Sequence, residues 1–180
     1  MMKSRYMPEI HHRRSIRLKG YEYSRTGAYF VTVCVKNREC LFGDIFDGRM
    51  VLNDAGRIVE RVWKDLPARF PSVELDAFAL MPNHVHGILA LVGAGLALPD
   101  KQGAASSAPT LGDVVRTFKS MSAIRVNRLL SCSGQPFWQR NYYEHIIRND
   151  DELNRTREYI QGNPANWSMD ENHSDRIDRR

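Results

Sequence analysis

Apolar and polar residues along the chain follow two periods, which predict where its strands and helices lie. Buried strands are rich in β-branched, aromatic and other apolar residues, and four stretches fit this description: 29–35, 73–81, 84–91 and 137–147. Two stretches repeat their apolar residues at the helical period: 53–70 and 111–130. A third helix is expected over 150–161, because acidic residues fill its first turn and Gly162-Asn163-Pro164 follows its end.

The predicted order is β-α-β-β-α-β followed by a C-terminal helix. This order is typical of the α+β class with a ferredoxin-like fold, an antiparallel sheet with its helices on one face. We expect residues 37–52 to form a Gly- and Asp-punctuated connection, and 93–110, rich in Gly, Ala, Ser and Pro, to form a flexible insertion. The last dozen residues are polar and are expected to be frayed.

Length and composition indicate one domain of an ordinary globular protein. The chain has 180 residues, of which 42% are hydrophobic and 26% charged. We expect no membrane partner, because no apolar stretch reaches transmembrane length and the basic N-terminus lacks the apolar core of a signal peptide. The three cysteines form no C-x-x-C pair, which is typical of a reduced cytoplasmic protein.

Positive charge is concentrated near the N-terminus. The chain carries 26 Lys and Arg against 21 Asp and Glu, a net charge of +5. A basic cluster of this kind suits contacts to nucleic-acid phosphates, although a solvated basic tail would have the same composition. The candidate DNA-binding residues in this cluster and on the second helix are Arg13, Arg14, Arg17, Lys19, Arg116 and Lys119.

His84-Val85-His86 opens the third predicted strand, directly after the turn signal Pro82-Asn83. Residues i and i+2 of a strand point to the same face, so the two imidazoles can converge on one cation while Val85 points into a core. The alternative is that two solvated histidines lie near a strand end by chance.

Tyr159 and Asn163 lie four residues apart near the end of the third predicted helix, and so on one helical face. The amide oxygen of Asn163 can be a third metal ligand beside two imidazoles, and the phenolate of Tyr159 can be a nucleophile. Alternatively, Tyr159 packs on the sheet and Asn163 caps the helix. Tyr142 and Tyr143 are rival nucleophiles, but they lie in a predicted strand without a partner at ligand spacing.

Together these motifs resemble the HUH single-tyrosine transposases, and most of all the REP-associated tyrosine transposases. The resemblance covers about residues 12–168. It rests on the His84-Val85-His86 triplet after Met-Pro-Asn and on the Tyr159-x-x-x-Asn163-Pro helix. The stretches 13–21, 27–32 and 137–146 are also similar to that family.

The resemblance implies three parts: a basic segment 1–24, a catalytic domain 25–168 that includes the 93–110 insertion, and a polar tail 169–180. It also implies cleavage of single-stranded or hairpin DNA with Mg²⁺ or Mn²⁺. The metal ligands would be His84, His86 and Asn163. Tyr159 would form a 5′-phosphotyrosine and free a 3′-OH, so that cleaved repeat DNA can be rejoined. Relatives act as monomers or homodimers, and both remain open here.

Two other functions fit parts of the sequence. A domesticated descendant could bind hairpin DNA without cutting it, using the same fold and basic residues. A zinc hydrolase could use His84 and His86, but no Asp-x-His or His-x-x-Glu partner follows the pair.

Imidazole ligands suit Mn²⁺ or Zn²⁺ better than Mg²⁺, and two histidines with one neutral amide supply no negative charge to hold Mg²⁺.

Overall fold

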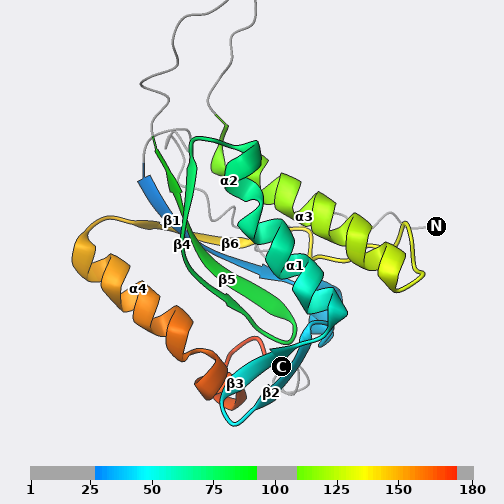
Figure 1. Ribbon diagram of the computed structural model, residues 1–180. Helices are drawn as coiled ribbons and strands as arrows, with labels where there is room; N and C mark the ends of the chain where they lie inside the picture. Colours follow the sequence, from blue (N-terminus) through cyan, green and yellow to red (C-terminus); the bar gives the residue numbers. More distant parts are fainter. Residues whose placement is uncertain (1–26, 93–108, 174–180) are drawn as a thin grey trace, which may run out of the picture.

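A four-stranded antiparallel sheet forms the centre of the computed structural model, which describes residues 27–92 and 109–173 (Figure 1). Its strands are β1 (Gly27–Cys34), β4 (Val73–Leu80), β5 (His84–Leu91) and β6 (Tyr143–Ile147). Their spatial order is β4-β5-β1-β6, with every neighbouring pair antiparallel. This is the ferredoxin-like arrangement, and the α+β class is confirmed.

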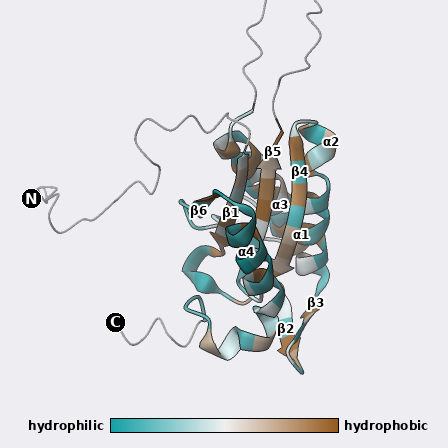
Figure 2. Cartoon of the chain, turned by 90° about the vertical axis from the view of Figure 1, so that its left-hand side faces the viewer, coloured by the Kyte–Doolittle hydropathy of each residue, from teal (hydrophilic) through white to brown (hydrophobic). Residues whose placement is uncertain are grey.

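Three helices cover one face of the sheet, and a fourth covers the other (Figures 1 and 2). The first face carries α1 (Asp54–Lys64), α2 (Leu66–Arg69) and α3 (Leu111–Leu129), and the second carries α4 (Asp150–Gly162). A 3₁₀ segment, η2 (Pro164–Met169), follows α4. Each long helix is preceded by a polar residue whose side chain accepts a hydrogen bond from the backbone N–H three residues further along: Asn53, Thr110 and Asn149.

Strand alternation divides the interior into two cores. The main core joins the sheet to α1 and α3 and includes Val31, Val85, Trp63 and Phe118. A smaller core of Ile88, Ile147 and Ile160 joins the sheet to α4. Val85 therefore points into the main core, as the sequence predicts, and the histidines on either side of it face α4.

The expected connection 37–52 contains more structure than predicted. It holds a short 3₁₀ segment, η1 (Lys36–Arg38), and a hairpin of β2 (Gly43–Phe46) and β3 (Arg49–Leu52). Asp47 and Gly48 form its turn with φ of 47° and 70°, the positive values of a type I′ turn. Each strand has only four residues, too few for a clear alternating pattern.

The fourth sheet strand is shorter than the predicted 137–147 and begins at Tyr143. Trp138 forms only an isolated bridge to Val35 and is buried in the main core. Lys119 explains the difference, since its Nζ donates to the backbone carbonyls of Gln139 and Arg140 at 2.7 and 3.0 Å. These carbonyls therefore bond to a side chain instead of a neighbouring strand.

Several predicted features lie outside the described residues. They are the basic segment 1–24 with Arg13, Arg14, Arg17 and Lys19, most of the 93–110 insertion, and residues 174–180. The described structure continues past 168, and it buries Asp170 within the stretch that the sequence assigns to a polar tail.

Candidate metal centre and nucleophile

His84 and His86 lie side by side on the α4 face of β5, and both are fully buried. Their Nε2 atoms are 2.9 Å apart. Burial lowers the pKa of each histidine to about 3, so both rings are neutral and available as ligands.

Neighbouring side chains fix the orientation of both rings. Asn83 Nδ2 donates to the carbonyls of Arg38 and Asn172, so its Oδ1 must be the atom that faces His84 Nδ1 at 2.7 Å. His84 Nδ1 therefore carries the proton, and its Nε2 keeps a lone pair. Thr32 Oγ1, on the adjacent strand, bonds His86 Nδ1 at 2.8 Å and can stabilise the matching tautomer.

A carboxylate completes the cluster. Asp170 Oδ2 lies 3.7 Å from His84 Nε2, and the ligand atoms of His84, His86 and Asp170 all lie within 4.8 Å of one another. Asp170 follows η2, whose Trp167 ring centroid lies 5.9 Å from that of His84 at the start of β5. The sequence carries no spacing signal for it, because more than eighty residues separate it from His86.

Asn163 lies at the C-cap of α4 and is buried. Its Oδ1 and Asp170 Oδ2 are both buried oxygens without a hydrogen-bond partner in the part of the chain that the structure describes. Unpartnered buried oxygens are costly in a folded protein. Two imidazole nitrogens, a carboxylate and an amide oxygen are a donor set that fits a divalent metal ion, which would satisfy these atoms.

Tyr159 lies beside this cluster. Its ring centroid is 5.3 Å from that of His86, and the side chain is 46% exposed. Partial burial and the charge of Asp170 raise the pKa of the phenol, while a hydrogen bond from the Asn163 side chain opposes the rise. Without a bound cation, Tyr159 is therefore protonated and within reach of a ligand from solvent.

The rival tyrosines lie on different sides of the sheet. Tyr142 packs against the main core, whereas Tyr143 faces the α4 side and lies 6.0 Å from Phe30 between ring centroids. Tyr143 is 45% exposed. The structure thus brings a second phenol near the site, although Tyr159 is the one in contact with His86.

The remaining predicted DNA-binding residues lie on α3, across the sheet from the histidines (Figure 1). Arg116 pairs with Asp113 at 2.8 Å, and Lys119 is held by two backbone carbonyls. Burial lowers the pKa of Lys119. Their contact with DNA stays a prediction.

No family model matches the chain. An uncharacterized protein of Haemophilus influenzae is 42% identical over 184 residues, which cover 94% of this chain and 98% of that protein. The chain belongs to the same family as that protein. Among the residues that the structure of our chain describes, no helix is long and apolar enough to cross a membrane.

A solved structure shares its fold. A REP-associated tyrosine transposase bound to a REP hairpin superposes with a TM-score of 0.54 and 21% identity, covering 86% of this chain and 76% of that one. A putative transposase from Deinococcus radiodurans gives a TM-score of 0.46 and 19% identity over 81% of this chain and 95% of that one. The chain therefore has a fold like that of the REP-associated tyrosine transposase.

Proposed function

We propose that this chain is a metal-dependent transposase that cleaves and rejoins single-stranded, hairpin-forming repeat DNA through a covalent 5′-phosphotyrosine. The observation that carries the proposal is the 5.3 Å contact between the rings of Tyr159 and His86, which places an accessible phenol beside a cluster of metal-ligating atoms. The REP-bound neighbour supports the choice of substrate.

In the proposed ligand set, His84, His86 and Asp170 hold a divalent ion, Mg²⁺ or Mn²⁺, and Asn163 offers a further oxygen. The carboxylate of Asp170 supplies the negative charge that two histidines and an amide lack, and this favours a hard divalent cation. When bound, the ion supplies positive charge that polarises a phosphate and counters the effect of Asp170 on the phenol.

In the proposed reaction, Tyr159 of this chain is the nucleophile. Tyr159 gives up its hydroxyl proton to water, and its oxygen attacks the scissile phosphorus. The bond from phosphorus to the 3′ oxygen breaks, and that oxygen takes up a proton to leave a free 3′-OH. The phosphate stays on Tyr159 as a 5′-phosphotyrosine. Because the diester bond energy is stored in the adduct, a 3′-OH can attack it and rejoin the strand without ATP.

The decisive experiment incubates the protein with labelled hairpin DNA from repeats flanking its gene, with Mn²⁺ or with EDTA. Wild-type protein should form a metal-dependent covalent adduct that peptide mapping places on Tyr159. Tyr159→Phe should keep DNA binding and lose the adduct, because only the nucleophilic oxygen is removed. Tyr143→Phe is the matched control and should still form it.

Other outcomes select other functions. An adduct that survives in Tyr159→Phe and is lost in Tyr143→Phe would move the nucleophile to β6. A hairpin that binds but is never cut, across several repeats and metals, would indicate a DNA-binding module without catalysis.

One observation favours a second candidate, a zinc hydrolase. Two histidines and one carboxylate are a common ligand set of catalytic zinc, which keeps a fourth position for water. Stoichiometric, tightly bound zinc in the purified protein, together with hydrolysis that leaves no protein adduct, would support this candidate over the transposase.

A further inference from the structure

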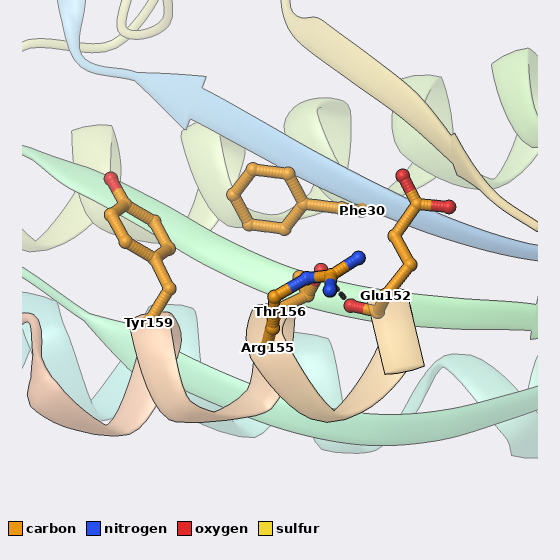
Figure 3. Close-up of a pocket in the computed structure, with 5 residues that line it drawn as sticks. All are labelled: Phe30, Glu152, Arg155, Thr156 and Tyr159. Atoms are coloured by element: carbon orange, nitrogen blue, oxygen red, sulfur yellow. Dashed lines mark hydrogen bonds between the residues drawn. The ribbon is translucent and has the colours of Figure 1, made fainter. Parts of the chain in front are cut away.

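A hollow of about 230 Å³ lies between β1 and α4, next to Tyr159 (Figure 3). Phe30 reaches into it from β1, and Glu152, Arg155, Thr156 and Tyr159 line it from α4. This volume is below the roughly 300–1,000 Å³ typical of pockets for drug-sized ligands, so it suits one planar ring system.

Phe30 connects this hollow to the candidate metal centre. Its ring stacks on His86 with centroids 5.4 Å apart and planes 25° apart. The rings of Tyr143 and Tyr159 meet it edge to face, with ring centroids each 6.0 Å from that of Phe30. A flat aromatic group resting against Phe30 would therefore lie directly beside the phosphate that Tyr159 is proposed to attack.

Arg155 gives the hollow a positively charged group. It lies one helical turn before Tyr159 on α4, and it is exposed. Within residues 27–92 and 109–173 it has no hydrogen-bond or ion-pair partner, in contrast to Arg157, which holds Asp76 through two bonds. An unpaired guanidinium at the mouth of an aromatic hollow is suited to a phosphate.

Glu152 closes the far end of the hollow. His145 Nε2 and the backbone N–H of Arg148 bond its carboxylate at 2.6 and 2.8 Å, and these bonds lower the pKa of Glu152. The carboxylate is therefore charged and repels a phosphate at that end. Arg155 lies between Glu152 and Tyr159 along α4, and it is the positively charged group that a phosphate in the hollow would meet.

We infer that this hollow binds the nucleotide flanking the scissile phosphate, with the base against Phe30 and its phosphate on Arg155. The inference rests on the proposed function, since it adds a subsite to the same centre. Aromatic stacking accepts any base, so the slot would hold the strand in position without reading its sequence.

The test measures binding in EDTA, where no cleavage can occur, by fluorescence anisotropy of a hairpin oligonucleotide with single-stranded flanks. An abasic residue is placed at each flank position in turn. Wild-type protein should lose affinity roughly 5- to 150-fold at one position beside the cleavage site, the range expected for one lost base–aromatic stack. Phe30→Leu should show no such loss at that position.

Arg155→Ala gives a second readout that does not disturb the core. Its affinity should fall, and the slope of log affinity against log salt should decrease by about 0.7, the value for one single-strand phosphate contact. Arg61→Ala is the matched control, since Arg61 is an exposed arginine on α1, across the sheet. It should leave both quantities unchanged.

The outcomes separate this inference from the proposed function. If the Tyr159 adduct forms but no abasic position weakens binding, or if Arg155→Ala behaves like Arg61→Ala, the slot is wrong and the transposase stands. If the abasic penalty appears and disappears in Phe30→Leu while no adduct ever forms, the slot stands and the catalytic proposal fails. Failure to bind the hairpins at all would overturn both.

Discussion

At the scale of single residues, Asn83 connects three separate parts of the chain. Its amide joins the carbonyl of Arg38, the carbonyl of Asn172 and the ring of His84, and it is fully buried. The residue therefore sets the tautomer of His84 and also holds the segment that carries Asp170 against the sheet. Residues of this kind act on a metal site without touching the ion.

We expect Asn83→Ala to weaken Mn²⁺ binding by about 10- to 100-fold, the usual effect of losing a partner that orients a ligand. Two partly buried carbonyls would also lose their donor, which should lower the free energy of unfolding by roughly 1–3 kcal/mol. Calorimetric titration and urea unfolding measure the two effects. Asn154→Ala, an exposed position on α4, is the control and should leave the Mn²⁺ affinity unchanged. Unchanged Mn²⁺ affinity in Asn83→Ala would contradict the orienting role.

The sequence identifies local groupings at this scale and misses distant ones. His84 and His86 are two residues apart, and Tyr159 and Asn163 are four apart, so the periods of strand and helix place each pair on one face. Asp170 has no local partner. Its place beside His84 depends on how η2 turns after Pro164, which hydrophobic patterning does not specify.

At the scale of elements, β5 must approach α1 closely. Gly87 follows His86 on β5 and faces Trp63, and a Cβ at this position would come within 2.3 Å of the Trp63 ring. The absence of a side chain at Gly87 thus lets Trp63 cover β5 directly. Gly162 differs, because a Cβ there would meet only Asn166 Nδ2 at an ordinary 3.6 Å.

These two glycines give a matched pair of predictions. Gly87→Ala should destabilise the protein by about 1–3 kcal/mol through overpacking against Trp63. Gly162→Ala should stabilise it by roughly 0.5–1 kcal/mol, because alanine loses less backbone entropy in the last turn of α4. Urea unfolding of both variants checks the signs. Destabilisation by Gly162→Ala would contradict the open space beside the end of α4, and a neutral Gly87→Ala would contradict the close contact between β5 and Trp63.

The spacing of apolar residues alone predicts most of the strands and long helices, because each of them buries a defined face. The β2–β3 hairpin does not, although Asp47-Gly48 is a recognised turn signal. Its strands are short and lie outside the main sheet, and Phe46 and Val51 stay 62% and 52% exposed. With so little burial, the alternation that reveals a strand is weak.

At the scale of the whole molecule, the sheet is covered unequally. The face toward α1 and α3 holds the large core, while the α4 face holds a three-residue core and leaves space for the histidines, Phe30 and the hollow. The stability of the fold and the candidate chemistry therefore occupy opposite faces of one sheet. This separation lets the α4 side carry buried metal-ligating side chains outside the large apolar core.

The buried histidines predict how the stability of the metal-free protein depends on pH. Their folded pKa values, near 3, lie below the ordinary value of 6.5, so the unfolded chain takes up protons first as the pH falls. Their contribution is complete above about pH 6.5 and decreases towards pH 3, by about 1.4 kcal/mol per pH unit for each histidine. Urea unfolding in EDTA measures this slope. His86→Phe should lose about half of it, and a flat profile would contradict neutral, buried imidazoles.

Metal binding should stabilise the whole molecule, because the proposed ligands come from β5 and from the two sides of η2. At a free Mn²⁺ concentration about 100 times the dissociation constant, the free energy of unfolding should rise by about 2.7 kcal/mol.

Asp170→Asn should require more Mn²⁺ for the same rise, since it removes the negative charge facing His84. Asp151→Asn, in the exposed first turn of α4, should behave as wild type. Thermal unfolding across a Mn²⁺ titration distinguishes the two variants without any DNA. Equal responses would mean that Asp170 is not a ligand, and that the charge of the site must come from the DNA phosphate.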